Sequence, residues 1–151
     1  MKENKLKARE YVFLLLKYRS RSEKELYGRL KRKKFEEGVI REVIQELKGK
    51  GFINDEDFAR AWVESRIKKP LGLRRLAQEL KQKGVNRQII DNQIQKAAQG
   101  YPEREIVSRI ARQRLERLKG IDQQKARTRI YSYLSRRGFS PEVIIDCING
   151  L

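Results

Sequence analysis

A pattern of apolar residues occurs three times in this chain of 151 residues. Each copy has an aliphatic residue, a second one four positions later, an apolar residue five further on, and then two adjacent β-branched residues. The copies comprise Leu26, Leu30, Phe35, Val39 and Ile40; Leu76, Leu80, Val85, Ile89 and Ile90; and Ile130, Leu134, Phe139, Val143 and Ile144. A period of about 50 residues is typical of tandem supersecondary units, so the fold is interpreted one unit at a time.

Helical spacing dominates each unit, and strand alternation is nearly absent. In the first unit an apolar stripe begins at Ala8, and Ser22 stands three residues before Glu25, which is the spacing of a capping box. Gly84 and Gly138 end the second helices of the later units as left-handed C′ residues. The sequence therefore predicts an all-α fold of three tandem three-helix repeats, about nine helices in an elongated, curved array. The predicted repeats are residues 1–53, 54–100 and 101–151.

Lys34 departs from this pattern, because it stands where the later units have Gly84 and Gly138. A residue other than glycine in a left-handed conformation costs about 1 kcal/mol. Two alternatives follow: Lys34 accepts that strain, or the first unit turns differently.

The charge balance indicates the kind of partner. The chain has 37 Lys and Arg residues against 20 Asp and Glu residues, which gives a formal net charge of +17. The three predicted repeats carry +8, +4 and +5, so the excess is spread along the array and is not an added basic tail. Such a balance favours a polyanionic partner, which is a nucleic acid, a nucleoprotein or an anionic membrane surface.

Signals for an enzyme are weak. The chain has no histidine, which excludes metal sites and acid–base chemistry that depend on histidine. Asp55, Glu56 and Asp57 are interpreted as the charged first turn of a helix, not as a cation site. Cys147 lies in a largely apolar stretch and is interpreted as a packed small hydrophobe. We therefore expect no catalytic residues, no metal and no cofactor.

The location is predicted from the cysteine content and from the lengths of the apolar runs. A single thiol forms no internal disulfide, which fits a reducing cytosol. The longest apolar run is 11–16, far short of the roughly 18–20 residues of a membrane span. We expect a cytoplasmic, monomeric protein.

Basic clusters are the stronger functional signal. The second helix of each unit ends in cations: Lys31, Arg32, Lys33 and Lys34 in the first, Lys81 and Lys83 in the second, and Arg136 and Arg137 in the third. The alternative interpretation is that these cations complement the helix dipole, but that effect does not require four in a row. Another cluster surrounds the turn at Pro70 and comprises Arg66, Lys68, Lys69, Arg74 and Arg75.

A third cluster lies at 109–117, where a solvated surface is the better-supported alternative. Glu105 precedes Arg109 by four residues and Glu116 follows Arg112 by four, a spacing that predicts ordinary ion pairs. Arg114 and Arg117 turn toward the apolar side of the same predicted helix. The predicted DNA-binding or filament-binding surface is Lys31, Arg32, Lys33, Lys34, Arg66, Lys68, Lys69, Arg74, Arg75, Lys81, Lys83, Arg112, Arg136 and Arg137.

The central part of the chain resembles the bacterial RecX regulatory family. The matching residues run at fixed spacing from Gly51 to Val85 and comprise Gly51-Phe52-Ile53-Asn54-Asp55, Phe58-Ala59, Arg66, Gly72, Arg75-Leu76, Glu79-Leu80 and Lys83-Gly84-Val85. Weaker similarity covers the rest of the chain, with Ala8, Ser22 and Glu25-Leu26 before this block and Leu134 and Arg136-Arg137-Gly138-Phe139 after it. Lys34 departs from the glycine usual in the family.

The resemblance implies a modulator of the RecA recombinase without enzymatic activity. Proteins of this family bind the RecA filament on single-stranded DNA and inhibit strand exchange, ATP hydrolysis and co-protease activity. The resemblance also implies tandem three-helix repeats, in agreement with the spacing. The competing hypothesis is a general DNA-binding helical module without a RecA-specific role, which composition and spacing favour nearly as much.

Overall fold

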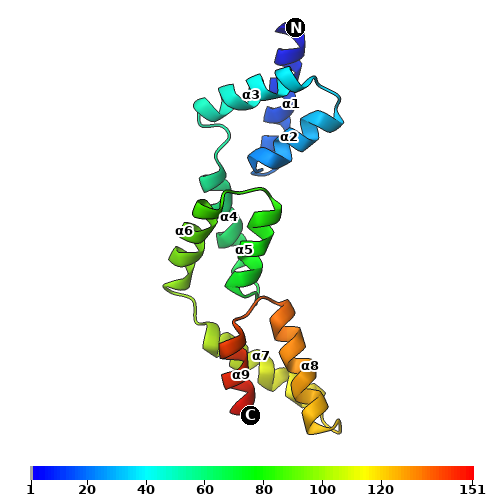
Figure 1. The fold of residues 1–151 in the computed structure, drawn as a ribbon, viewed down its shortest axis with the longest axis vertical. Helices are drawn as coiled ribbons and strands as arrows, with labels where there is room; N and C mark the ends of the chain where they lie inside the picture. The colour runs from blue at the N-terminus through cyan, green and yellow to red at the C-terminus, as the bar shows by residue number, and fades with distance from the viewer. Residues whose placement is uncertain (1) are drawn as a thin grey trace. The chain divides into compact units, whose positions relative to one another are not determined.

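The protein is all-α, as predicted. The computed structural model describes residues 2–151, which contain nine helices and no strand (Figure 1). The helices are α1 Lys2–Tyr18, α2 Glu23–Arg32, α3 Glu37–Gly49, α4 Asp55–Arg66, α5 Leu73–Gln82, α6 Arg87–Ala98, α7 Glu103–Arg117, α8 Gln123–Arg136 and α9 Pro141–Asn149. None of these helices is both long enough and apolar enough to cross a membrane.

The chain forms two compact units. One contains the residues up to Trp62 together with Leu80–Gln93, and the other contains Val63–Glu79 together with Ile94–Leu151. The division passes through α4, α5 and α6, so the helices of the second repeat contribute to both units. The predicted repeat boundaries fall between helices, and their assignment as domain boundaries stays a prediction.

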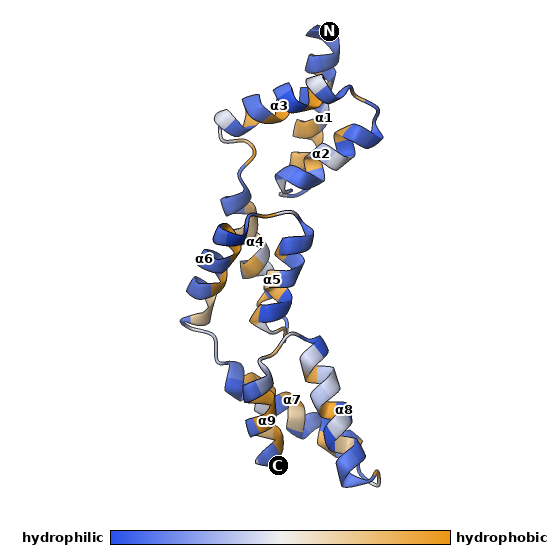
Figure 2. Ribbon diagram, viewed as in Figure 1, coloured by the Kyte–Doolittle hydropathy of each residue, from blue (hydrophilic) through white to orange (hydrophobic). Residues whose placement is uncertain are grey.

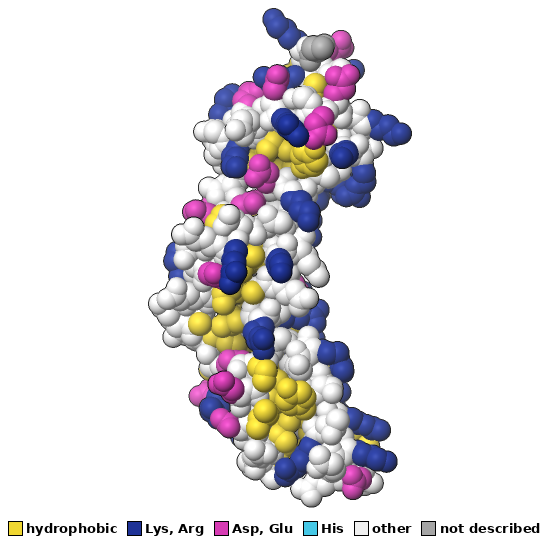
Figure 3. Space-filling model, in the orientation of Figure 1, with side chains coloured by type: hydrophobic (Ala, Val, Ile, Leu, Met, Phe, Trp, Pro, Cys, Tyr) yellow, Lys and Arg dark blue, Asp and Glu magenta, His cyan; other side chains and the backbone are white. Residues whose placement is uncertain are grey.

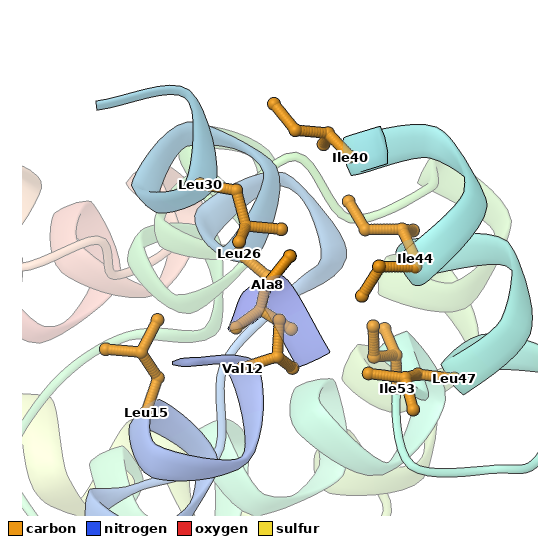
Figure 4. Close-up of a cluster of buried hydrophobic side chains, with 10 residues drawn as sticks. Ala8, Val12, Leu15, Leu26, Leu30, Ile40, Ile44, Leu47 and Ile53 are labelled. Carbon is orange, nitrogen blue, oxygen red and sulfur yellow. The ribbon is translucent and has the colours of Figure 1, made fainter. Parts of the chain in front are cut away.

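The first repeat has its own core. Helix α1 packs against α2 and α3. The side chains labelled in Figure 4 point toward one another; they come from these three helices and, for Ile53, from the segment that follows α3. Leu26 and Leu30 belong to the repeated pattern and are fully buried, as is Ile40. Burying one such side chain stabilises the fold by about 1.5–3 kcal/mol, so the repeated pattern marks the interior.

The same pattern is buried in the other two repeats. Helix α7 packs against α8 and α9, and Ile130, Leu134 and Phe139 are almost fully buried there. Figure 2 shows orange, apolar residues alternating with blue ones along these helices. The buried apolar residues of the second repeat are Phe58, Ala59, Val63, Leu71, Leu76, Leu80, Val85 and Ile90.

Side chains cap the starts of α2, α4 and α8, and the capping box of Ser22 and Glu25 is among them, as predicted. Ser22 and Glu25 form the capping box of α2. The Asn54 side chain accepts hydrogen bonds from the backbone N–H groups of the first turn of α4, and the Asp122 side chain accepts one from the N–H of Lys125. Because these caps satisfy N–H groups that a helix cannot pair internally, they define where the helices begin.

Lys34 takes the left-handed conformation. Its φ is 68°, close to the 78° of Gly84 and 88° of Gly138. The next residue closes the same hydrogen bond in each repeat, from the N–H of residues Phe35, Val85 and Phe139 to the carbonyls of Leu30, Leu80 and Leu134. The first alternative therefore holds: Lys34 accepts the strain and the turn is unchanged.

Acid stability of the first repeat depends on Glu46. One guanidinium nitrogen of Arg9 donates to both carboxylate oxygens of Glu46, at 2.8 and 2.9 Å. This bond, with those from Lys50 and Lys5, lowers the pKa of Glu46 to about 2. Its folded-state pKa lies below the unfolded value of about 4.3, so its contribution to stability is present above that value and is lost as the pH falls toward 2.

Replacing Glu46 with glutamine should therefore remove this pH dependence. We expect the difference in unfolding free energy between wild type and Glu46→Gln to be largest at neutral pH, to fall as the pH drops below about 4, and to vanish below pH 2. Urea unfolding at a series of pH values measures it. Glu10→Gln is the control, because Glu10 is exposed and makes no ion pair among residues 2–151. An equal acid response in both variants would contradict the assignment.

Candidate nucleic-acid interface

The start of α2 receives the turn between α5 and α6. Ser22 is fully buried. Its hydroxyl accepts a hydrogen bond from the N–H of Glu25 at 3.2 Å and donates one to the carbonyl of Lys83 at 2.7 Å. The Lys83 ammonium lies 3.2 Å from the Glu25 carboxylate. We call this contact of Ser22 and Glu25 with Lys83 and Gly84 the first junction.

A second junction joins the start of α5 to the turn between α8 and α9. The N–H of Gly72 donates to the carbonyl of Arg137 at 2.8 Å, and the N–H of Arg74 donates to the carbonyl of Gly138 at 3.3 Å. The Arg137 side chain donates to the carbonyl of Pro70 at 3.2 Å. A Cβ on Gly72 would overlap the carbonyl group of Gly138. The two backbones therefore approach as closely as glycine allows.

The two junctions use equivalent positions. Ser22 and Gly72 each lie four residues before the first leucine of the repeated pattern, and Lys83 and Arg137 each lie three residues after the second. In both cases the carbonyl of the cationic residue is the acceptor. The repeated sequence thus specifies one way of docking a turn onto a helix start, and the chain uses it twice.

Charge at the first junction is balanced locally. Burial acts to raise the pKa of Glu25, but hydrogen bonds from Arg19, from the N–H of Ser22 and from Lys83 outweigh it and lower that pKa. Burial raises the pKa of Asp55, whose carboxylate accepts a hydrogen bond from the N–H of Glu23 at 2.9 Å. Glu25 is therefore held ionised between cations, which makes this junction structural.

The cations at the end of α2 face solvent. Lys31, Arg32, Lys33 and Lys34 are all exposed, and we call them the α2 cluster. The ammonium of Lys33 lies 5.2 Å from the centre of the Tyr11 ring and that of Lys31 lies 6.0 Å from the Tyr27 ring. No ion pair neutralises these four side chains within residues 2–151, so the cluster is available to an anion.

The second junction gathers two basic segments that are far apart in the sequence. The hydrogen bonds of Gly72, Arg74 and Arg137 bring residues 66–75 beside residues 136–138. Lys68, Lys69, Arg74 and Arg136 are exposed there, and we call these four the junction cluster. Figure 3 shows Lys and Arg side chains in dark blue over helices of both units.

Other predicted interface residues hold the fold together. Arg66 binds Glu79 through two nitrogens, at 3.1 and 2.6 Å, and this hydrogen bonding raises the pKa of Arg66. Arg75 lies 3.5 Å from Glu79 and donates to the carbonyl of Arg136. Together with Lys83 and Arg137 in the junctions, these half-buried side chains already have protein partners.

The sequence matches three family models that together span most of the chain. They are described as the first, second and third three-helix domains of RecX and match residues 8–47, 54–92 and 102–148. The chain belongs to the RecX family. The resemblance found in the central block is thereby confirmed, and so is the fold of three tandem three-helix repeats.

RecX relatives match this chain over most of its length. Proteins named Regulatory protein RecX include one from Mycobacterium sp. (strain KMS), 36% identical over 93% of this chain and 79% of its own. Another, from Chlorobium phaeobacteroides (strain BS1), is 35% identical over 95% of this chain and 92% of its own. The crystal structure of RecX from Lactobacillus salivarius superposes with a TM-score of 0.86 at 22% identity, over 100% of this chain and 98% of that one. The Mycobacterium and Chlorobium relatives are regulatory proteins by name.

The predicted ion pairs of α7 are wrong. Glu116 pairs with Lys119 at 2.8 Å, and in the described part of the chain neither Arg109 nor Arg112 is paired with the glutamate four residues away. Both arginines are exposed, so a spacing of four residues alone does not hold a flexible surface side chain in an ion pair. Arg114 does turn inward, with its guanidinium 3.6 Å from the centre of the Tyr133 ring. Arg112 therefore remains available to a ligand.

Sequence reasoning missed cations beside the first junction. Arg21 donates to the carbonyl of Leu15, and burial followed by repulsion from Arg19 and Arg29 lowers its pKa. Lys24 lies against Gly84. Residues 18–25 of this junction are equivalent to residues 68–75 of the second, so the 50-residue register would have identified them.

Two open clefts beside the first junction have mixed charge. One, of about 800 Å³, is lined by residues that include Lys5, Glu42 and Ile44, and another, of about 880 Å³, by residues that include Lys48 and Asp55. Carboxylates in both clefts disfavour an anionic ligand. The exposed clusters are therefore the better candidates for contact with a polyanion.

Proposed function

We propose that this protein binds the RecA filament on single-stranded DNA and inhibits the recombinase, ATPase and co-protease activities of RecA. In this role it is a cytoplasmic, monomeric regulator without enzymatic activity that modulates DNA repair and the SOS response. The observation that carries the proposal is the match to all three RecX domains in their natural order along the chain.

The exposed cations support contact with DNA phosphates in the filament. Ten of the predicted interface residues are exposed: Lys31, Arg32, Lys33, Lys34, Lys68, Lys69, Arg74, Lys81, Arg112 and Arg136. Each lysine or arginine that neutralises a phosphate releases condensed counterions, so binding weakens as salt increases. A protein making about six such contacts loses roughly a thousandfold in affinity between 50 and 200 mM salt.

Reversing the α2 cluster to glutamate should weaken inhibition of RecA. The measurement is ATP hydrolysis by RecA on single-stranded DNA with substoichiometric protein. We expect at least about a tenfold loss of potency and a shallower salt dependence, because up to four phosphate contacts become repulsive. The control reverses four exposed cations outside the candidate surface and has the same net charge: Lys17, Lys96, Lys125 and Arg129.

Different outcomes address different parts of the proposal. Absence of any inhibition by the wild-type protein would refute the RecA-specific role, and equal binding to naked duplex and single strands would then favour a general DNA-binding module. If inhibition survives reversal of the α2 cluster and also of the junction cluster, the basic surface is not the contact. An equal loss of inhibition in the control variant would show that the effect comes from net charge and not from the α2 cluster.

A further inference from the structure

The chain contains a turn and a helix start at the positions that would form a third junction, but both differ from their equivalents in the two junctions. In each junction a carbonyl oxygen of the turn accepts a hydrogen bond that the helix start donates. The first repeat has an equivalent turn at Lys33 and Lys34, and the third repeat has an equivalent helix position at Ala126. Within residues 2–151 nothing docks on that turn, and its residues are exposed. If both elements matched those of the two junctions, a second copy of this chain would join the first through them.

The turn of the first repeat carries a side chain where docking requires none. A Cβ on Gly138 would overlap the backbone nitrogen and Cα of Arg75, and a Cβ on Gly84 would overlap the side chain of Lys24. Lys34 places a Cβ and a long charged side chain at this position. The conformation of the turn is preserved, so the Lys34 side chain is what distinguishes this turn from the two that dock.

The helix start of the third repeat is covered by its own chain. Helices α2 and α5 begin three residues before the first residue of the repeated pattern, whereas α8 begins seven residues before it. The additional four residues are about one helical turn, and they account for the spacing of 54 in place of 50. At the position of Gly72, whose N–H binds the docked turn, Ala126 donates its N–H to the carbonyl of Asp122 at 2.9 Å. The N–H group that would bind a docked turn is therefore already used within α8.

We propose that Lys34 and the extra turn Asp122–Lys125 terminate the array, and that they prevent a second copy of this chain from extending it through the junction that links its own repeats. The lysine changes the turn and the extra helical turn changes the helix start, and each change prevents docking at its own element. The proposal is independent of the RecA target, because it concerns only contacts between repeats.

The test is to remove both terminators. Lys34→Gly restores the docking turn. Deletion of Asp122–Lys125 together with Ala126→Gly restores the docking helix start. In this variant Ile121 is followed directly by the glycine at 126, as Leu71 is followed by Gly72, and both pairs then lie at the same distance before the repeated pattern. We expect each change alone to leave a monomer, an equimolar mixture of the two variants to form 1:1 dimers, and the combined variant to form chains. Sedimentation velocity at about 100 μM should show an average mass at least about twice that of one chain.

Two results would overturn the proposal. One is head-to-tail association of the wild-type protein, and the other is a combined variant that is folded by circular dichroism and stays monomeric. If the deletion prevents folding, Gly84→Lys tests the lysine separately. It should open the first junction and increase amide exchange at Glu25 at least about tenfold over Gly120→Lys, whose Cβ meets open space. An intact first junction in Gly84→Lys would equally overturn the assignment of Lys34.

Discussion

Replacing Gly138 by alanine is expected to lower the free energy of unfolding by about 3 kcal/mol, from two separate effects. The φ of Gly138 is 88°, and a left-handed conformation costs a residue with a Cβ about 1–2 kcal/mol. The new Cβ would also overlap the backbone of Arg75, and such overpacking costs about 1–3 kcal/mol. Because the overlapping atoms include the backbone nitrogen and Cα of Arg75, which cannot rotate away as a side chain can, the second junction must widen to accept the methyl group.

Gly120→Ala separates the two effects. Gly120 has the same φ of 88°, but a Cβ there would meet no atom within 4 Å. We expect a loss of only about 1–2 kcal/mol. Urea unfolding monitored by circular dichroism measures both variants. Equal losses would show that close packing at the second junction contributes nothing.

Ser22→Ala is expected to destabilise the protein by about 2–3 kcal/mol. The substitution removes the N-cap of α2, which costs about 1 kcal/mol. It also leaves the carbonyl of Lys83 without the hydroxyl that binds it in a fully buried position, which costs about 1–3 kcal/mol. Chemical denaturation of the variant measures the loss.

Ser140→Ala is the matched control. Ser140 stands at the start of α9, but its side chain makes no capping hydrogen bond. We expect a change within about 0.5 kcal/mol, as for a residue without such a feature. A comparable loss in both variants would contradict the role assigned to the Ser22 hydroxyl.

Much of the fold could be predicted because its signals are local. The buried stripe follows from helical periodicity, and the capping box of Ser22 and Glu25 can be recognised within four residues of sequence. Glycines at 84 and 138 predicted left-handed turns for the same reason. Lys34 could not be decided from the sequence, because its strain is opposed by tertiary packing of the first repeat, including Phe35.

The candidate interface was harder to predict, because charge in the sequence does not show which cations are already paired. Lys83 and Arg137 align with Lys33, but they bind groups 58 and 67 residues away in the sequence. Those partners are defined only once the repeats have docked. The sequence also contained an unused signal: the change of spacing from 50 to 54 residues is one helical turn, and it marks the altered start of α8.

The docked turns are held mainly by their carbonyl oxygens, and this has a consequence for how such a protein can evolve. A main-chain acceptor is present whatever side chain the residue carries, so lysine and arginine serve equally at positions 83 and 137. Mutation of the exposed cations in the α2 and junction clusters can therefore change the surface charge while the carbonyl contacts between repeats are kept. The charged surface that contacts a target and the junctions that link the repeats can in this way change independently.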